Sequence, residues 1–288
     1  MSRSVLVTGA NSGIGLVTCL ELARAGYDVV GSVRSAAKSE VVERAAADKG
    51  VTVRTVELDV DDAASCEAGI KAFEDLTGAG PWALINNAGY AQTGAIEDVS
   101  DELALRQFQT NVFAPMRLSR LVLPGMRERG EGRIVNVSSV AGRLSTPLMG
   151  WYSASKHALE ALTDAMRIEV AQDGIRVVLI EPGMFGTDIW SAAKEGGFPE
   201  ATSARYAAAY ARAESLAHRS NRLPDPVWVA RTIRVSLTNP VPLARYLVGV
   251  DAVTGTLAET LLPSTVMDYA KSVVAGLKSL PVKLPYLP

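Results

Sequence analysis

Short runs of β-branched residues alternate with longer stretches of helical periodicity along most of the chain, and this alternation limits the fold more than any other feature. Stretches of that length can cross over a sheet and return the chain to a parallel neighbouring strand. The pattern therefore predicts an α/β fold with a doubly wound parallel sheet. The expected strands are residues 4–8, 28–33, 52–58, 83–86, 133–138, 176–181 and 245–250. The expected helices are residues 13–25, 36–49, 63–77, 101–128 and 152–172.

The length of 288 residues lies within the range that α/β folds use as a single domain. We predict one Rossmann-type domain over residues 1–288, with about seven parallel strands and helices on both faces. No internal repeat or low-complexity linker divides the chain. Residues 251–288 follow the last expected strand and are predicted to form a variable C-terminal extension.

Residues 199–218 add a further helical pattern between the sixth and seventh expected strands. Tyr206, Tyr210 and Ala213 share one face of that helix, because they follow one another at four- and three-residue spacing. In an open parallel sheet the ligand crevice lies at the carboxyl ends of the strands. We therefore predict that residues 188–224 form an insertion that acts as a lid over the substrate.

Charge and hydropathy argue against several classes of function. The formal net charge is -2, from 29 basic and 31 acidic residues, and no dense Lys/Arg run is present, so a nucleic-acid partner is not expected. The apolar stretches are short and broken by charges, glycine or proline, which predicts no membrane span. The N-terminus reaches a glycine turn by Gly9 without an apolar signal-peptide region, so we expect a cytoplasmic protein.

Cysteine and histidine spacing favours no metal site. Cys19 and Cys66 fall within helical stretches and have no CxxC partner, which predicts buried reduced thiols. His157 and His218 also lack the spacing of metal ligands. We therefore expect no bound metal.

A glycine-rich turn, T8-G-A-N-S-G-I-G15, follows the first expected strand and opens the first helix. Glycine can adopt positive φ and lets the backbone approach a pyrophosphate, while a helix N-terminus supplies free N–H groups and a positive dipole. In a repeating strand–helix chain this position indicates a dinucleotide site, and an ordinary tight turn is the alternative. The predicted phosphate-binding residues are Gly9, Asn11, Ser12, Gly13, Ile14 and Gly15.

The residues after the second strand, V33-R34-S35, indicate which dinucleotide binds. An NAD site usually places Asp or Glu there to hold the ribose 2′-hydroxyl, whereas a 2′-phosphate needs a cation. No carboxylate is present at this tip, and Arg34 can pair with a phosphate through charge-assisted contacts. We therefore predict that NADP(H) is favoured over NAD(H). The alternative is that Arg34 is a solvated residue at the start of a helix.

The stretch Y152-S-A-S-K156 places a phenol and an ammonium one helical turn apart, which is also the spacing of any two neighbours on a helix. Tyrosine has a pKa of about 10 in water, and a nearby ammonium stabilises the phenolate and lowers that value. Tyr152 can then donate a proton to a ketone oxygen or accept one from an alcohol. Ser139, at the end of the fifth expected strand, can hydrogen-bond the same oxygen.

Together these motifs resemble the short-chain dehydrogenase/reductase family. The matching segments follow the family order over roughly the first two thirds of the chain. They are T8-G-x3-G-x-G15, N86-N-A-G89, Asn111, Ser139, Y152-x3-K156 and P182-G-x3-T187. The resemblance implies that Ser139, Tyr152 and Lys156 form the catalytic triad, with Asn111 joining through a water-mediated proton relay. We interpret Asn86 as a structural residue of the sheet.

The same resemblance implies contacts along the whole cofactor. Lys156 would bind the nicotinamide ribose. The other implied contacts are Asp59 and Val60 at the adenine, Asn87, Ala88 and Gly89 beside the adenosine ribose, and Pro182, Gly183 and Thr187 at the nicotinamide carboxamide. Asn111 as a polar residue inside a helix and Pro182-Gly183 as a simple turn are the alternatives. Ser138 rivals Ser139, but an extended strand turns the two to opposite faces, and the family register selects Ser139.

The segments expected to contact the substrate are mainly apolar. They are residues 141–151, the loop after Thr187 with Met184 and Phe185 just upstream of it, and the tail beyond Tyr206. Their apolar residues include Leu144, Pro147, Leu148, Met149, Trp151, Met184, Phe185, Ile189, Trp190 and Phe198. No Arg or Lys cluster indicates a phosphorylated or carrier-bound substrate, so a small hydrophobic carbonyl or alcohol is favoured. Residues 239–246 and the long C-terminal region resemble the 17β-hydroxysteroid and retinol dehydrogenase branch, which implies a steroid-like substrate.

We therefore predict an NADP(H)-dependent carbonyl reductase or alcohol dehydrogenase, with Tyr152 as general acid and base. A non-catalytic nicotinamide-dinucleotide sensor is the alternative, and the intact Ser139, Tyr152 and Lys156 argue against it. A dehydratase or epimerase acting on an activated sugar ranks last, because no basic cluster for a nucleotide-sugar pyrophosphate is visible. The family resemblance also implies a homodimer or homotetramer that assembles through the helices at 101–128 and 152–172.

Overall fold

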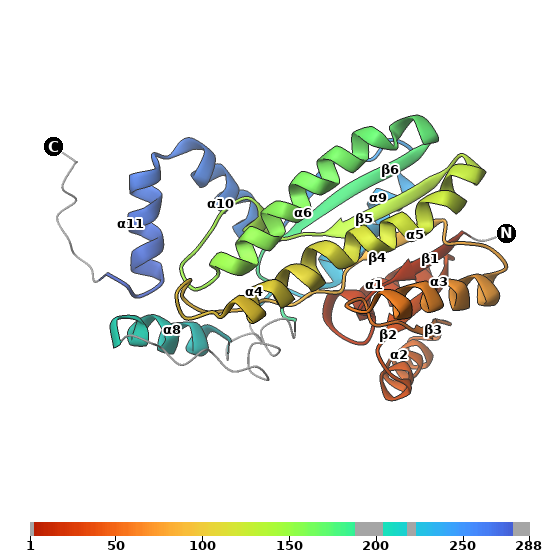
Figure 1. Ribbon diagram of the computed structural model, residues 1–288, viewed down its shortest axis with the longest axis horizontal. Coiled ribbons are helices and arrows are strands. Elements are labelled where there is room, and N and C mark those ends of the chain that lie inside the picture. Colours follow the sequence, from red (N-terminus) through yellow and green to blue (C-terminus); the bar gives the residue numbers. More distant parts are fainter. Residues whose placement is uncertain (1–2, 188–203, 218–222, 279–288) are drawn as a thin grey trace.

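The computed structural model describes residues 3–187, 204–217 and 223–278. Seven strands form one parallel sheet in the order β3-β2-β1-β4-β5-β6-β7, which confirms the predicted doubly wound architecture (Figure 1). The strands are β1 (Ser4–Val7), β2 (Asp28–Val33), β3 (Arg54–Glu57), β4 (Ala83–Asn86), β5 (Gly132–Val137), β6 (Ile175–Pro182) and β7 (Arg245–Val248).

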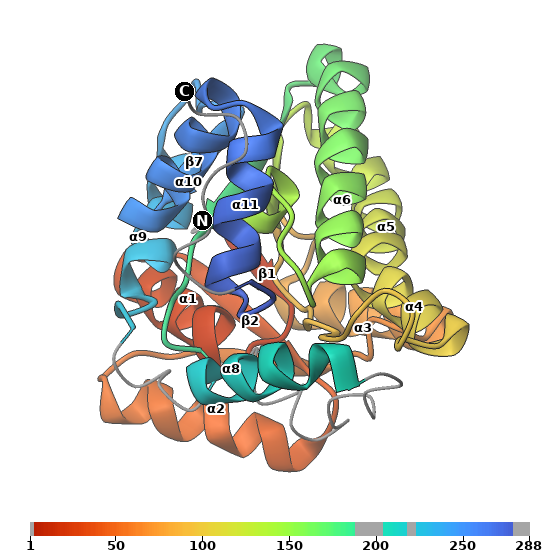
Figure 2. The same ribbon diagram turned by 90° about the vertical axis from the view of Figure 1, so that its left-hand side faces the viewer.

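Helices cover both faces of the sheet. Figure 2 shows α1, α2 and α9 on one side and α3, α5 and α6 on the other. The helices up to β6 are α1 (Gly13–Arg24), α2 (Ala36–Asp48), α3 (Ala63–Thr77), α4 (Asp101–Phe108), α5 (Ala114–Arg129) and α6 (Gly150–Glu169). Those after β6 are α8 (Ala207–Ala217), α9 (Val227–Thr238), α10 (Val250–Leu261) and α11 (Ser264–Val274).

The strands are apolar on both faces because both faces are covered. In β1, Val5 and Val7 pack into the layer beside α1 and α9, while Leu6 packs into the layer beside α3 and α5. Alternate side chains of a strand point to opposite faces, so a buried parallel strand needs an unbroken apolar run. Strand β4 has the apolar run Ala83–Ile85 for the same reason, and it ends in a buried polar residue, Asn86. Asn86 Nδ2 donates to Asn136 Oδ1 at 2.8 Å and braces β4 against β5.

The stretch expected as one helix over residues 101–128 is divided in the structure. A π-helical turn, Gln109–Phe113, separates α4 from α5. Pro115 has no N–H, so the carbonyl of Asn111 lacks its ordinary α-helical donor four residues later. A wider turn at this point is the expected response of the backbone, and such turns often occur at functional sites.

The extra helix expected between the sixth and seventh strands is present as α8, preceded by a 3-10 turn at Ala204–Tyr206. Its side chains Tyr206, Tyr210 and Ala213 do share one face, and they pack against Ala95 and Leu148. Much of the predicted 188–224 insertion, namely residues 188–203 and 218–222, lies outside the described residues.

Candidate active site

A glycine turn joins β1 to α1 at the point where the strand order reverses. β1 lies between β2 and β4, and ligands of such sheets bind in the crevice at this switch point. Gly9 and Gly13 adopt φ values of +65° and +51°, which glycine adopts without strain. A Cβ on Gly15 would lie 2.2 Å from the Gly9 carbonyl oxygen, so the helix can start this close only without a side chain. Ser12 makes no side-chain cap, which leaves the first N–H groups of α1 available for an anion.

Thr8 joins this turn to the loop after β4. Its buried hydroxyl accepts hydrogen bonds from the N–H groups of Asn87 and Ala88, at 3.0 and 2.9 Å. The same hydroxyl donates to the Ile85 carbonyl at 3.3 Å, and the Asn87 side chain donates to the Thr8 carbonyl at 2.9 Å. One threonine therefore holds two pocket-lining segments in register, although the sequence presented it only as the first residue of a motif.

Two cations border the pocket beyond β2. Arg34 lies at the carboxyl end of this strand, and Lys38 lies one turn into α2. The sequence-based analysis missed Lys38, which the first turn of α2 places beside the same pocket as Arg34. Asp59 and Val60 border the pocket after β3, and the N–H of Asp59 is fixed by Ser65 Oγ at 2.9 Å.

Asn111 lies behind the pocket wall rather than on it. Its Nδ2 donates to the Tyr90 carbonyl at 3.0 Å and to Ser155 Oγ at 3.1 Å, and its Oδ1 accepts from the Tyr90 N–H at 3.2 Å. A Cβ on Gly89 would lie 3.1 Å from that Oδ1. The side chain is therefore committed to bracing the loop after β4, and the backbone carbonyl is the atom of Asn111 left for a relay.

Ser139, Tyr152 and Lys156 meet at the same pocket, as the sequence predicted. Ser139 begins the 3-10 turn Val140–Gly142 after β5 and its Oγ accepts from the Ala141 N–H at 3.1 Å. Tyr152 and Lys156 lie one turn apart on α6 and are 6% and 5% exposed. Lys156 Nζ donates to the Val137 carbonyl at 2.9 Å and lies 5.8 Å from the centre of the Tyr152 ring.

Burial shifts the acidity of this pair against the sequence-based expectation. It raises the pKa of Tyr152 to about 12, while a hydrogen bond with Ser139 works against the rise. Burial also lowers the pKa of Lys156 to about 8, which the Glu160 carboxylate opposes. Burial disfavours the charged form of both Lys156 and Tyr152. The pKa of Tyr152 is therefore raised, and the lowering that the sequence predicted is not found. The phenol is neutral at neutral pH and available as a proton donor.

The end of β6 is tied to the C-terminal region. Pro182, Gly183 and Thr187 border the pocket. Asp251, in the first turn of α10, accepts a hydrogen bond from the Met184 N–H at 2.6 Å, and a Cβ on Gly183 would lie 2.2 Å from its Oδ1. Gly183 is therefore required by this close approach. The sequence-based analysis missed Asp251, since nothing near it in the sequence indicates a contact with β6.

The pocket has a volume of about 720 Å³ and brings together nearly all of the predicted site residues. Two predicted residues are not on its wall: Gly15 packs beneath the glycine turn, and Asn111 lies behind the wall. The predicted residues that do line it are Gly9, Asn11, Ser12, Gly13, Ile14, Arg34, Asp59, Val60, Asn87, Ala88, Gly89, Ser139, Tyr152, Lys156, Pro182, Gly183 and Thr187.

The pocket that Ser139, Tyr152 and Lys156 line has a partly apolar wall. Its apolar side chains include Leu144, Met149, Met184 and Phe185. Two other expected wall residues pack elsewhere: Leu148 contacts Tyr210 of α8, and Trp151 lies edge-on against Phe108 with ring centres 6.4 Å apart. The expected contacts Ile189, Trp190 and Phe198 lie outside the described residues.

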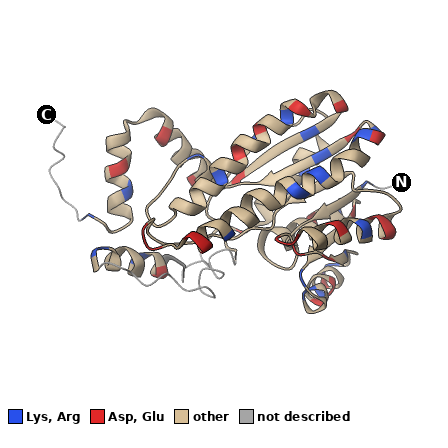
Figure 3. Ribbon diagram, in the orientation of Figure 1, with Lys and Arg blue, Asp and Glu red and all other residues tan. Residues whose placement is uncertain are grey.

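Charges of both signs are interspersed over the helices (Figure 3). In the described part of the chain, no group of three or more His, Cys, Asp and Glu side chains is placed to hold a metal ion. Within the same ranges, no helix combines the length and the apolar character needed to cross a membrane. Cys19 and Cys66 are both buried free thiols, as predicted.

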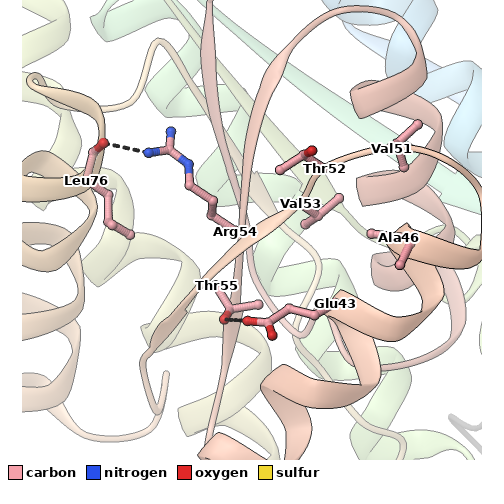
Figure 4. Close-up of a pocket in the computed structure, with 9 residues that line it drawn as sticks. Glu43, Ala46, Val51, Thr52, Val53, Arg54, Thr55 and Leu76 are labelled. Atoms are coloured by element: carbon pink, nitrogen blue, oxygen red, sulfur yellow. Dashed lines mark hydrogen bonds between the residues drawn. The ribbon is translucent and has the colours of Figure 1, made fainter.

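A second hollow, of about 440 Å³, lies beside the edge strand β3 and α2 (Figure 4). The side chains of Glu43, Arg54 and Thr55 in this hollow already bond within the protein. Arg54 donates to the Leu76 carbonyl at 2.6 Å, and Thr55 donates to Glu43 Oε1 at 3.4 Å. This hollow contains none of the predicted site residues, so the pocket at the carboxyl ends of the strands is the candidate active site.

Known proteins share this sequence pattern. A model of the short chain dehydrogenase family matches residues 3–197. The chain is 33% identical over 272 residues to an NADPH-dependent 3-dehydrocapnine reductase of Ornithobacterium rhinotracheale, covering 92% of this chain and 95% of that protein. It is 37% identical over 193 residues to retinol dehydrogenase 8 of Homo sapiens, covering 65% of this chain and 60% of that protein.

Solved structures share the fold. A short-chain dehydrogenase from Streptomyces avermitilis is 32% identical and matches with a TM-score of 0.77, covering 95% of this chain and 96% of the other. An actinorhodin polyketide ketoreductase solved with NADPH is 30% identical and matches with a TM-score of 0.74, covering 87% of this chain and 97% of the other. The similarity therefore extends over most of the chain in both sequence and fold.

Proposed function

The chain belongs to the short-chain dehydrogenase/reductase family and is an oxidoreductase, and from this premise we propose that it transfers hydride between NADP(H) and the carbonyl or secondary alcohol of a hydrophobic substrate. The observation that carries the proposal is the convergence of Ser139, Tyr152 and Lys156 on the pocket beside the glycine turn. A bound nicotinamide supplies or accepts the hydride. The residues of this chain then have to orient the carbonyl and provide its proton.

Tyr152 is the general acid for reduction in this proposal. Its phenol, with a pKa of about 12, holds its proton at neutral pH and can donate it to a ketone oxygen placed between Tyr152 and Ser139. Ser139 donates a second hydrogen bond to that oxygen. Lys156, held by the Val137 carbonyl, supplies positive charge that compensates the phenolate as it forms. The same groups, with the proton moving the other way, oxidise an alcohol.

Asn111 completes the proton route to solvent in this proposal. Its side chain is bonded to Tyr90 and Ser155, so its backbone carbonyl is the atom that would hold a water molecule near Lys156. Pro115 cannot compete for that carbonyl, because proline has no N–H.

Arg34 and Lys38 support NADP(H) over NAD(H). Both border the pocket beyond β2, where a 2′-phosphate would need cations, and no carboxylate occupies the strand tip. The glycine turn fits a pyrophosphate, since Gly9 and Gly13 present backbone without side chains to the pocket and Ser12 leaves the first N–H groups of α1 uncapped. One relative is named NADPH-dependent, and a similar ketoreductase was solved with NADPH.

The cofactor preference is tested by replacing each cation. We expect Arg34→Ala and Lys38→Ala each to lower kcat/KM for NADPH by about 10- to 100-fold, since a charge-assisted hydrogen bond contributes about 1.5–3 kcal/mol. The values for NADH should stay unchanged. Lys49→Ala, at the other end of α2, is the matched control. An unchanged ratio of NADPH to NADH efficiency in both variants would refute the assignment.

The apolar wall supports a hydrophobic substrate. Leu144, Met149, Met184 and Phe185 stand beside the catalytic groups, and two of the relatives are named for retinol and for 3-dehydrocapnine. An apolar pocket with few polar groups binds through burial and orients through those few groups. Hydrophobic ketones and aldehydes, including steroid ketones and retinal, are therefore the substrates to assay.

The 188–224 insertion serves in this proposal as the substrate lid. In its described part, Tyr210 of α8 donates to Asp98 Oδ2 at 2.7 Å and also bonds to the Ala95 N–H at 2.8 Å. These contacts fasten α8 to the loop after β4, whose residues Tyr90 and Gln92 border the pocket. Cover from this side would keep water from the reacting carbonyl.

A homodimer or homotetramer is proposed through the helices of the α4 to α6 layer. Four apolar side chains of this layer are exposed, namely Leu105, Phe113, Leu162 and Ile168. Exposed apolar groups gathered on neighbouring helices are typical of subunit interfaces. Sedimentation of the wild type and of an Ile168→Glu variant would test this assembly, and an unchanged sedimentation coefficient would count against it.

The function itself is tested by NADPH consumption against the ketone and aldehyde panel, with Tyr152→Phe as the diagnostic variant. Phenylalanine keeps the ring and removes the proton donor, so we expect turnover to fall by at least about 100-fold while NADPH still binds. A wild type that binds NADPH but reduces no member of the panel would instead favour the sensor alternative.

A further inference from the structure

Two buried glutamates lie behind the turn that carries Ser139. Glu160 belongs to α6 and Glu181 to β6, and they are 5% and 1% exposed. Arg245, from β7, reaches both: its Nε lies 3.1 Å from Glu160 Oε2 and 3.2 Å from Glu181 Oε1. Nothing in the proposed reaction uses either carboxyl group.

Two arginines supply the positive charge nearest the Glu160/Glu181 pair. Arg245 is shared with a third carboxylate, Asp164, which also pairs with Arg167 at 2.6 Å. Arg143 lies 3.9 Å from Glu181 Oε1 and is partly solvated. The charged groups that face the pair from the elements packed around it are Lys156 and Asp164 of α6, Arg143 after the 3-10 turn and Arg245 of β7. The charge of Arg245 is therefore divided among three carboxylates, and Arg143 is the second cation at the pair.

The burial of both carboxyl groups makes a doubly ionised Glu160/Glu181 pair unfavourable. Two ionised carboxylates at this depth would repel each other without enough compensating charge. Burial first, and the Glu160 charge second, raise the pKa of Glu181 from 4.5 to about 7. Glu160 Oε1 is buried and accepts no hydrogen bond from any described residue, and Glu181 Oε1 is buried with ion-pair contacts to Arg245 and Arg143 alone among the described residues. A proton between the two acids would satisfy both oxygens.

The pair also adjoins the catalytic residues. A Cβ on Gly142 would lie 2.9 Å from Glu160 Cγ, so the turn that starts at Ser139 rests directly on this glutamate. Glu160 follows Lys156 by one helical turn, and its carboxylate raises the pKa of Lys156 against the effect of burial. The charged state of Lys156 is therefore favoured by Glu160, a carboxylate that does not line the pocket.

We propose that Glu160 and Glu181 are positioning residues that share one proton. The pair then carries a single negative charge next to Lys156, and Glu160 keeps its packing contact with the turn that follows Ser139. Glu160 keeps the charge that faces Lys156, and Glu181 carries the proton. The role toward Lys156 rests on the proposed function, whereas the shared proton does not.

The shared proton is tested by unfolding, without any substrate. Because the pKa of Glu181 is raised on folding, the folded protein binds more protons than the unfolded chain between pH 4.5 and about 7. The pair should therefore increase the unfolding equilibrium constant by up to about two orders of magnitude as pH rises through this window. Glu181→Gln keeps the shape and a donor, so that increase should disappear. Glu169→Gln, an exposed residue of α6, should behave as the wild type.

The role toward Lys156 is tested by the pH profile of ketone reduction with NADPH. Glu160→Gln removes the negative charge next to Lys156, so the alkaline fall of kcat/KM should move to lower pH. For each pH unit by which this fall moves, kcat/KM measured at alkaline pH should decrease about tenfold. In Glu181→Gln this fall should stay in place, because Glu160 remains charged.

Two results would overturn the proposal. One is a Glu181→Gln protein whose stability depends on pH as that of Glu169→Gln does. The other is a Glu160→Gln enzyme whose alkaline fall matches the wild type. A wild type that reduces no ketone would count against the proposed function instead, and the unfolding data would still decide whether the proton is shared.

Discussion

Thr8→Val is the substitution whose cost can be worked most directly from the structure. Valine has nearly the shape of threonine, so the packing of β1 is kept and no cavity forms. What disappears is one buried hydroxyl, which accepts from the N–H groups of Asn87 and Ala88 at 3.0 and 2.9 Å and donates to the Ile85 carbonyl at 3.3 Å. The Ala88 N–H then loses its acceptor, whereas the Asn87 N–H still reaches the Ile85 carbonyl at 3.0 Å.

The expected loss is about 1–3 kcal/mol in the free energy of unfolding. A buried donor left without a partner costs about that much, and the Ala88 N–H is the donor left here. Domains of this kind are stable by only about 5–15 kcal/mol, so one hydroxyl carries a substantial part of the total. Affinity for NADPH should fall as well, because Asn87 and Ala88 border the pocket.

Urea unfolding would measure the loss, with Thr18→Val as the matched control. Thr18 is also fully buried, but its hydroxyl has no hydrogen-bond partner among the described residues. Removing that hydroxyl should therefore be neutral or stabilise by about 1 kcal/mol. Thr8→Ser, which keeps the hydroxyl, should recover most of the loss. If Thr8→Val and Thr18→Val are equally stable, the hydrogen-bond argument is wrong.

Two further predictions follow from the site. Gly15→Ala should abolish NADPH binding and lower stability, because its Cβ would lie 2.2 Å from the Gly9 carbonyl; cofactor titration that matches the wild type would contradict this. Activity in ketone reduction should fall as pH rises through about 8, where Lys156 loses its charge, and a profile flat through that region would contradict the role of the ammonium. Stability has the opposite sign: the pKa of Lys156 is lowered from 10.5 to about 8, so the folded state binds fewer protons and this residue's contribution rises with pH across that window.

Much of the fold could be predicted from local patterns. Strands β2 and β4 and helix α3 begin and end where the sequence predicted, because apolar runs, turn residues and helix caps are local signals. The division of the 101–128 helix was missed, although Pro115 carries the physical reason for it. Strand geometry left Ser138 and Ser139 as alternatives, and the family resemblance selected Ser139. Helix periodicity gave the one-turn spacing of Tyr152 and Lys156.

Other features depended on residues far apart in the chain. The contact of Asp251 with Met184 joins segments 67 residues apart, and the shared guanidinium of Arg245 joins β7 to α6 across 85 residues. No spacing rule relates such positions, because loop lengths between elements vary without changing the sheet. These contacts are visible only when β6, β7 and α10 are placed side by side.

The sequence by itself determined the alternation of strands and helices, the glycine turn and the one-turn spacing of Tyr152 and Lys156. All three depend on residues that are neighbours in the chain. Only the tertiary structure decided how acidic these groups are: burial raises the pKa of Tyr152 and lowers that of Lys156, and Glu160 opposes the second shift. Desolvation depends on everything packed around a group, and that surrounding is assembled from distant parts of the chain.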